Sequence, residues 1–283
     1  MKKTLVSLLA VFALTVIFTS CTKEGQYMPS KKISEIVYVH SHKVGDLLVS
    51  TSESEKWTWG GKLLSYIDYY NVDGVRTRTV LFRYDNDNRI EEVEDGTYNM
   101  KYAYENNHLK EIVVVNTTNG KEVQKMAFSY KGSKLATIDV TTYDTKGAES
   151  YSFNPLRFVV PENVAAMVTS QNDVKGTVRT TFTWTGSNIT EMTSDRGLSV
   201  KWSYDKNTNP FKGFLNMENT FDFAYSANNI IRQDLSVNGE ATVLEYEYEY
   251  DGKYPTKVKY QSESSTLVPG YTLTVDNVTE YKY

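Results

Sequence analysis

The sequence predicts an all-β fold: a long antiparallel meander of about eight repeated hairpins, curled or split into a sandwich-like or open barrel-like sheet. The first supporting observation is an internal repeat. Two aromatic residues spaced two apart recur eight times, at intervals of roughly twenty to twenty-six residues with one longer gap. Residues two apart in a strand face the same side, so each pair places two rings together on one face of a sheet. The pairs are Trp57/Trp59, Phe82/Tyr84, Tyr102/Tyr104, Phe128/Tyr130, Phe182/Trp184, Trp202/Tyr204, Phe223/Tyr225 and Tyr248/Tyr250.

The second observation is the sequence that follows each pair. A polar, turn-forming segment comes first, such as Thr185-Gly186-Ser187-Asn188, and it predicts a hairpin loop. An apolar residue follows, usually with another three positions later. Because a spacing of three changes face in a regular strand, the first apolar residue is expected at the loop or on a β-bulge. These first positions are Leu64, Ile90, Leu109, Leu135, Ile189, Ile230 and Pro255.

The third observation is a second class of turn between the units, most often Asn-Gly or Asp-Gly. Such dipeptides supply the positive φ that a tight hairpin turn needs. The two turn classes alternate, which predicts longer loops at one end of the sheet and tight turns at the other. Two strands per unit give about sixteen strands, so the sheet must curl, split or close. The tight turns are Asp73-Gly74, Asp95-Gly96, Asn119-Gly120, Lys146-Gly147 and Asn238-Gly239.

Composition agrees with this fold class and narrows the function. The chain of 283 residues contains 22 tyrosines and four tryptophans, which are residues that favour strands. Its formal net charge is −4 and it has no basic run, so no nucleic-acid partner is expected. The strand Glu245 to Tyr250 alternates carboxylates with tyrosine rings, which predicts a solvated outer face over a packed inner one. That alternation argues against a membrane barrel, whose lipid-facing side is apolar.

The N-terminus predicts export. Residues 1–20 have a cationic start and an apolar run from Leu5 to Phe18, as in a secretory signal peptide. Cys21, the single cysteine, follows at the cleavage position. The arrangement resembles a bacterial lipobox with Phe18 in place of leucine, and this resemblance implies acylation of Cys21 and attachment to a membrane. In a Gram-negative cell it implies an outer-membrane location, on the periplasmic or the surface face. Residues 21–32 are then the lipid anchor and tether.

The repeat residues carry a wider resemblance. The segments Tyr84-Asp85-Asn86-Asp87-Asn88-Arg89-Ile90 and Tyr250-Asp251-Gly252-Lys253 resemble the tyrosine-aspartate (YD/RHS-like) repeat of large bacterial shell-forming proteins. The chain looks most like small Gram-negative lipoproteins of unknown function that carry degenerate copies of it. The resemblance covers roughly residues 57–259, although only Asp85, Asp205 and Asp251 retain the aspartate after the second aromatic residue. It implies an architecture and an envelope location, with no family active site.

Two irregular segments interrupt the repeat. Residues 33–283 are expected to form one repeat domain, with halves at about 33–150 and 177–283 joined by the irregular segment 151–176. A smaller interruption covers residues 207–214. Binding surfaces most often lie on such loops, because regular strands are occupied in holding the sheet together. The candidate binding residues are Phe153, Leu156 and Arg157 in the first segment, and Phe211, Lys212 and Phe214 in the second.

Other residues that are capable of chemistry fit simpler roles. All four tryptophans occupy repeat positions, which favours cross-strand packing over sugar stacking. His40 and His42, with Asp46 nearby, lack the spacing of a metal site, and Asp85 with Asp87 fits turn chemistry better than an acid/base pair or a calcium loop. No nucleophile elbow, phosphate loop or zinc motif occurs, so neither a cofactor nor a metal is expected.

The sequence therefore favours a non-enzyme of unknown specific function: an exported lipoprotein that acts as a non-catalytic binding or scaffold module at the cell envelope. Its ligand would be a glycan or an envelope protein. One alternative is a polymer-degrading hydrolase whose carboxylates converge only in the fold. Another is a purely structural shell or assembly component.

Overall fold

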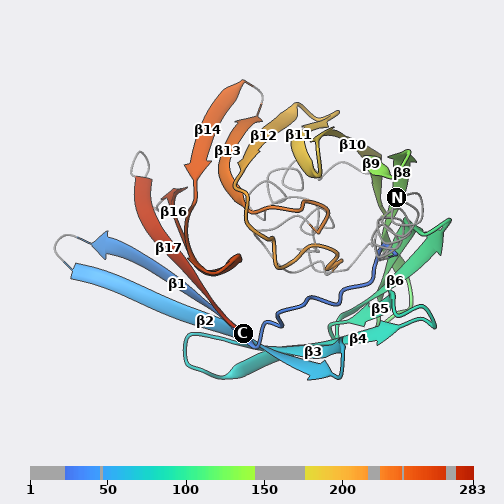
Figure 1. Cartoon of the computed structure of the whole chain (residues 1–283), viewed down its shortest axis with the longest axis horizontal. Coiled ribbons are helices and arrows are strands. Elements are labelled where there is room, and N and C mark those ends of the chain that lie inside the picture. The colour runs from blue at the N-terminus through green and yellow to red at the C-terminus, as the bar shows by residue number, and fades with distance from the viewer. Residues whose placement is uncertain (1–22, 45–46, 144–175, 216–223, 238, 266–271) are drawn as a thin grey trace, which may run out of the picture.

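A computed structural model describes residues 23–44, 47–143, 176–215, 224–237, 239–265 and 272–283, in which seventeen strands form one antiparallel sheet (Figure 1). Strands that are consecutive in sequence pair with each other, except β14 with β15, so the predicted meander is confirmed. The strands are β1 Glu35–Val44, β2 Leu47–Gly60, β3 Leu63–Tyr70, β4 Arg76–Tyr84, β5 Ile90–Glu94, β6 Tyr98–Glu105, β7 His108–Asn116, β8 Glu122–Lys131, β9 Lys134–Thr142, β10 Gly176–Thr185, β11 Asn188–Ser194, β12 Leu198–Tyr204, β13 Ile230–Val237, β14 Glu240–Glu245, β15 Glu247–Asp251, β16 Tyr254–Ser265 and β17 Thr272–Lys282.

The sheet curls until its first and last strands meet. β1 pairs with β2 on one side and with β17 on the other, from Glu35↔Lys282 to Ser41↔Asp276. β9 pairs directly with β10, so the sheet continues across the junction between the two sequence halves. The result is a nearly closed barrel with one unsealed seam, between β14 and β16. This is the open barrel-like form of the predicted meander.

A β-bulge recurs at the same place in the repeat. In seven hairpins the strand register shifts immediately before the second aromatic residue of the pair. In the first hairpin, for example, Trp57 lies opposite Ile67 and Trp59 lies opposite Leu64. Because of the bulge, two apolar residues that are three positions apart on one strand lie opposite two aromatic residues that are two positions apart on the other. This confirms the bulge expected from the apolar spacing.

Hydrogen bonds from the second aromatic residue connect neighbouring units. Tyr84 donates to the carbonyl of Leu64 at 2.8 Å, and Tyr104 donates to that of Ile90 at 2.7 Å. Each acceptor is the first apolar residue after the loop of the preceding hairpin. These bonds satisfy carbonyl groups at the looped end of the barrel and set the stagger between units. The same bond is made from Trp184 to Leu135, from Tyr204 to Ile189 and from Tyr283 to Pro255.

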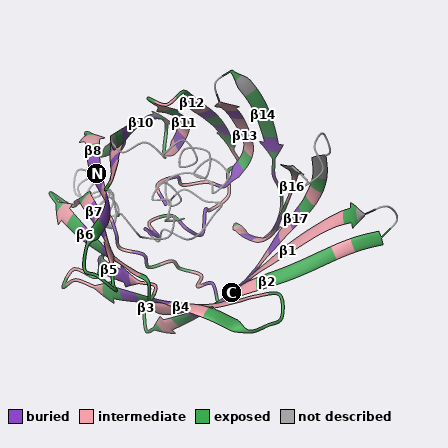
Figure 2. Ribbon diagram, turned by 180° about the vertical axis from the view of Figure 1, so that it is seen from behind, coloured by how far each residue is buried: buried purple, intermediate pink, exposed green. Residues whose placement is uncertain are grey.

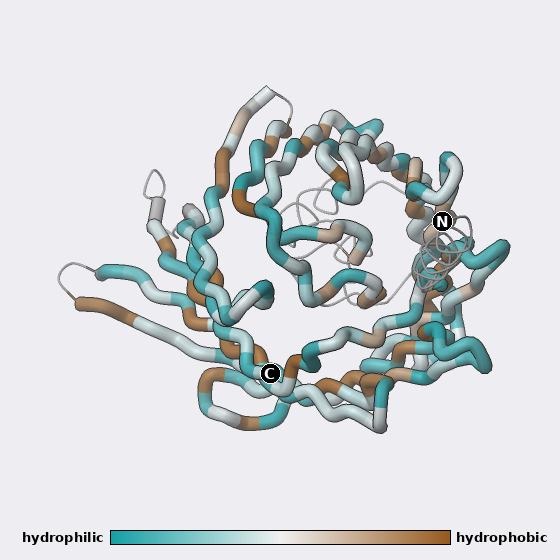
Figure 3. The backbone as a smooth tube through the Cα atoms, viewed as in Figure 1, coloured by the Kyte–Doolittle hydropathy of each residue, from teal (hydrophilic) through white to brown (hydrophobic). Residues whose placement is uncertain are grey.

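The apolar residues of the strands face the inside of the barrel. Figure 2 shows buried residues alternating with exposed ones along the strands, and Figure 3 shows the matching alternation of hydropathy. The first aromatic residue is buried in six of the pairs, as for Trp57 and Phe82, and half-buried at Tyr248, whereas the second is half-buried near the loops. Ion pairs such as Arg83–Glu92 and Lys259–Glu249 cross between strands on the outer face.

Two segments outside the ladder fill part of the barrel interior. Residues 23–34, which include most of the predicted tether 21–32, run inside the ring of strands, as does the described part of the β12–β13 connection (Figure 1). Tyr27 from the first segment lies 4.5 Å, ring centre to ring centre, from Phe214 of the second. Both side chains are buried. The N-terminal segment therefore contributes Tyr27 and Ile33 to the core.

One of the eight aromatic pairs is not part of the ladder. Ile230 lies opposite Tyr204, so β12 and β13 form one hairpin with residues 205–229 as its connection. Tyr225 lies in that connection, in a turn, and Phe223 falls outside the described residues. The prediction of a hairpin at Phe223/Tyr225 was wrong, because the apolar residue after it already completes the Trp202/Tyr204 unit. No helix that is long and apolar enough to cross a membrane occurs in the described ranges.

Candidate ligand pocket at the looped end of the barrel

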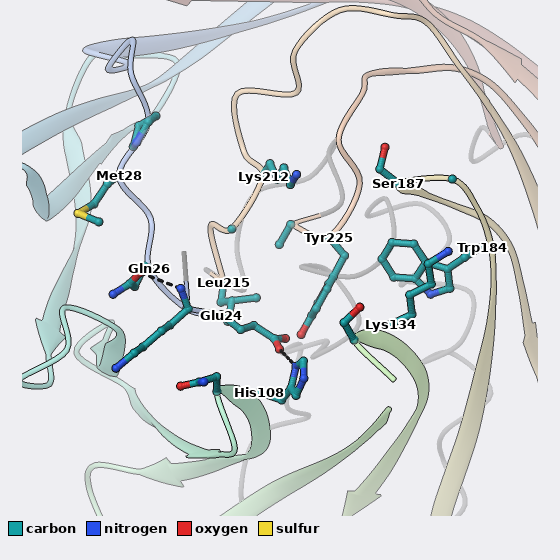
Figure 4. A pocket seen from close by; sticks show the side chains of 18 residues that line it. Glu24, Gln26, Met28, His108, Lys134, Trp184, Ser187, Lys212, Leu215 and Tyr225 are labelled. Carbon is teal, nitrogen blue, oxygen red and sulfur yellow. Dashed lines mark hydrogen bonds and ion pairs between the residues drawn. The ribbon is translucent and has the colours of Figure 1, made fainter. Parts of the chain in front are cut away.

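A pocket of about 760 Å³ opens at the looped end of the barrel (Figure 4). Its walls come from the β6–β7, β8–β9 and β10–β11 hairpins, the N-terminal segment and the β12–β13 connection. The side chains that define it include Glu24, His108, Lys134, Trp184, Lys212 and Tyr225. This volume lies within the range of ordinary small-molecule sites.

Backbone hydrogen bonds hold the N-terminal segment against the pocket. The amide of Ile90 donates to the carbonyl of Gly25 at 3.0 Å, and the side chain of Gln26 donates to the carbonyl of Asp87 at 2.6 Å. Gly25 has a φ of +85°, and a side chain there would collide with the ring of Tyr104. Glycine is therefore required at this position both for its backbone conformation and for the close approach of the ring.

The carboxylate of Glu24 is the centre of a polar cluster. One oxygen lies 3.0 Å from Nδ1 of His108, and the other accepts a hydrogen bond of 2.7 Å from the hydroxyl of Tyr130. The hydroxyl of Tyr225 also interacts with Glu24 and lies 3.4 Å from that of Tyr130. The His108 and Tyr130 rings stack at 4.4 Å. The cluster thus joins the N-terminal segment to two hairpins and to the β12–β13 connection.

Tyr130 departs from the bonding pattern of the repeat to form this cluster. By its position it would donate to the carbonyl of Leu109, but it donates to Glu24 instead. Burial, followed by the negative charge of Glu24, raises the pKa of Tyr130 and of Tyr225 well above that of a free tyrosine. Both hydroxyls are protonated at neutral pH, and that of Tyr130 donates to the carboxylate.

The opposite side of the pocket is cationic and aromatic. The ammonium group of Lys134 lies 5.6 Å from the ring centre of Trp184, within cation–π range. Lys212 is exposed and lines the same pocket, and Figure 4 shows Lys134 beside Trp184 and Lys212 on the other side of Tyr225. Lys23, in contrast, is paired with Asp87 at 2.9 Å. Of the lysines that line the pocket, Lys134 and Lys212 are thus the two that can contact a ligand.

The residues predicted from the sequence to bind a ligand or a lipid fall into three groups. Phe211 and Phe214 are buried in the core, against Trp57, Tyr27 and Tyr281. Their neighbour Lys212 lines the pocket. The nominated residues Phe153, Leu156 and Arg157, together with Cys21, lie outside the described residues.

Other nominated positions have structural partners. Nδ1 of His40 lies 2.7 Å from the side-chain oxygen of Asn277. Asp85 accepts hydrogen bonds from the amides of Asp87 and Arg89, both at 2.9 Å, as turn chemistry requires. The indole of Trp59 donates to the carbonyl of Ile33 at 2.7 Å. Trp184 makes the equivalent repeat bond at 2.7 Å and also lines the pocket.

Sequence reasoning missed the cluster itself. Glu24 was assigned to the tether, and Tyr130 and Tyr225 were assigned to the repeat. Neither periodicity nor spacing connects residue 24 with residue 108, because the two meet only after the barrel has curled around the N-terminal segment. The only local signal was Gly25, a glycine next to a charged residue in an otherwise polar stretch.

Comparison with known proteins gives fold similarity alone. No protein-family model and no curated protein matches the chain. Among solved structures, a porin-like protein from Bacteroides uniformis superimposes with a TM-score of 0.51 at 10% identity, covering 90% of this chain and 98% of that one. A porin-like protein from Bacteroides vulgatus gives 0.43 at 10% identity, with 89% and 98% covered. A TcdB2-TccC3-Cdc42 structure gives 0.29 at 13% identity, with 83% of this chain and 15% of that chain covered. The chain thus shares its barrel fold with the first of these proteins.

Proposed function

We propose that the chain is an exported lipoprotein, held at the outer membrane by acyl chains on Cys21, which acts as a non-catalytic binding module for an acidic glycan. The observation that carries the glycan part is the pairing of Lys134 with the ring of Trp184 at the mouth of a pocket of about 760 Å³. Saccharides stack on aromatic rings, and an ammonium group beside such a ring attracts a carboxylate or sulfate on the sugar. Lys212 adds a second cation to the same pocket.

Binding fits the pocket better than hydrolysis does. Glycoside hydrolases use two carboxyl groups about 5–9.5 Å apart. Glu24 is the one carboxylate among the described lining residues, and His108 and Tyr130 already engage it. One carboxylate among the described lining residues does not supply the pair that this mechanism uses, and the contacts of Glu24 fit a role in organising the site.

The lipid anchor fits the position of the N-terminal segment. Cys21 is only two positions before Lys23, which lines the pocket, and two residue steps span at most about 7 Å. Acyl chains on Cys21 would therefore bring the looped end of the barrel to the membrane surface. The outer face of the sheet carries cross-strand ion pairs, which suits a barrel that stands in water beside the membrane.

A glycan array with acidic and neutral members tests the binding part. We expect binding to acidic glycans, and a loss of at least tenfold in affinity for Trp184→Ala and for Lys212→Ala. Lys121→Ala is the matched control, because Lys121 is exposed in the β7–β8 turn at the other end of the barrel. An array without any binding, or equal losses in the control, would refute the acidic-glycan proposal.

Membrane fractionation tests the anchor separately. Cys21→Ser should leave the precursor unprocessed or release the protein from the outer membrane, whereas the unaltered protein should fractionate with it. Protease treatment of intact cells then distinguishes the surface face from the periplasmic face. Unchanged fractionation of Cys21→Ser would contradict lipidation without affecting the glycan proposal.

A further inference from the structure

The seam of the barrel has two strand edges without a ladder partner in the described part of the chain. β14 pairs with β13 through Glu245, and the next strand, β15, pairs with β16 on its other side, from Glu247↔Lys259 onward. The chain thus changes partners at Tyr246, whose amide donates to the carbonyl of Ile231 at 3.0 Å. From Tyr246 back toward the β13–β14 turn, β14 and the end of β16 diverge, and a cleft of about 660 Å³ lies between them.

The backbone of β14 presents hydrogen-bonding groups to this cleft. In an antiparallel ladder, alternate residues direct both their N–H and C=O groups toward the same neighbour. The N–H group of Tyr246 points at β13. The N–H and C=O groups of Glu245, Val243 and Ala241 therefore point away from β13 and into the seam. Val243 is also 47% exposed. An exposed strand edge of this kind is a template for the addition of another strand.

The outer rim of the cleft is acidic. Its described lining contains Glu245, Glu247 and Asp276 against the single cation Lys259. Lys259 is paired with Glu249 at 2.8 Å and Glu245 with Arg232 at 2.7 Å, both partners lying outside this lining, so Glu247 and Asp276 give the rim its negative charge. On the inner side, Tyr260 lines the cleft and its ring lies 5.3 Å, centre to centre, from that of Tyr246, which is buried like its strand neighbour Leu244. A complementary strand would therefore carry basic residues outward and apolar residues inward.

We propose that this seam binds an extended basic segment of a partner protein, which pairs with the free edge of β14 and completes the barrel wall. A second copy of this chain is a poor occupant, since its net charge of −4 would oppose the acidic rim. Backbone pairing supplies the affinity, and the alternation of cationic and apolar side chains supplies the selectivity. This inference is independent of the glycan pocket, which lies at the looped end of the barrel.

The probe is a synthetic eight-residue peptide of alternating valine and lysine, with a valine–glutamate peptide of the same length for comparison. We expect the lysine peptide to bind the whole mature protein and the glutamate peptide to bind at least tenfold more weakly. Amide hydrogen exchange should then slow at Ala241, Val243 and Glu245, because these amides enter a new ladder. Failure of the lysine peptide to bind, or binding without this protection, would overturn the proposal.

Two variants localise the effect. Val243→Pro removes a seam-facing amide without removing a bond to β13, and should weaken the lysine peptide at least tenfold, whereas Val243→Ala should leave its affinity within about twofold. Should Val243→Pro fail to fold, the double variant Glu247→Lys with Asp276→Lys provides the test. It should reverse the preference from the lysine peptide to the glutamate peptide, and an unchanged preference would refute the acidic rim as the selective element.

Discussion

A carboxylate oxygen of Glu24 lies 3.0 Å from Nδ1 of His108, although 84 residues separate the two in sequence. The contact joins the N-terminal segment inside the barrel to the β6–β7 hairpin of its wall. The Glu24 side chain is 14% exposed, so the interaction is shielded from solvent. It therefore helps to fix the segment that directly follows the proposed lipidation site.

Glu24→Ala should release this segment. We expect a loss of about 1–3 kcal/mol in the free energy of unfolding, because the hydroxyl of Tyr130 loses its acceptor in a partly buried site. Trypsin should also cleave faster after Lys31 and Lys32. Denaturant titration and timed proteolysis measure the two effects. Glu105→Ala is the control: its pair with Lys110 is more than half exposed, so the change should stay within about 0.5 kcal/mol.

Phe214→Ala should be more destabilising. The Phe214 ring lies 4.5 Å from Tyr27, 5.0 Å from Trp57 and 5.7 Å from Phe82, ring centre to ring centre. Truncation leaves a cavity between the N-terminal segment and the wall, at a cost of about 3–5 kcal/mol. Phe214→Leu retains most of the volume and should cost about 1.5 kcal/mol or less. Equal unfolding midpoints for the two variants would contradict a packed interior.

Tyr104→Phe tests the hydrogen bonds that connect the repeat units. The variant retains the ring but leaves the carbonyl of Ile90 without its donor, so we expect a loss of about 1 kcal/mol. Tyr66→Phe is the matched control, because among the described residues the Tyr66 hydroxyl makes none of these connecting bonds, and it should change stability by less than about 0.5 kcal/mol. If both variants unfold at the same denaturant concentration, these bonds do not stabilise the barrel.

Alkaline pH should destabilise the protein between pH 10 and 12. Burial, followed by the hydrogen bond to Asp205, raises the pKa of Tyr250 to about 12 from its ordinary value of 10.0. The folded chain then retains this proton more tightly than the unfolded chain does. The resulting stability is complete below pH 10 and declines as the pH rises toward 12. Thermal unfolding at successive pH values measures the decline, which should be less steep for Tyr250→Phe; an unchanged slope would exclude Tyr250 as a contributor.

Local rules account for most of the barrel wall. Pairs such as Trp57/Trp59 specify which face is buried, and the apolar residues after each loop specify the bulge, because both depend on residues within one hairpin. Phe223/Tyr225 shows the limit of such reasoning. The pair has the same local pattern, but the apolar residue that follows it, Ile230, lies opposite Tyr204 in the sheet. Only the register of the whole sheet decides between the two assignments.

Strand alternation and turn chemistry act over a few residues, so they suffice to predict an all-β meander with a looped end and a tight-turn end. Three other features emerge only in the folded barrel. β1 meets β17, residues 23–34 enter the barrel, and the ladder stays open between β14 and β16. These depend on the accumulated twist and stagger of seventeen strands, which no single hairpin specifies. The contact of Glu24 with His108 belongs to this second group.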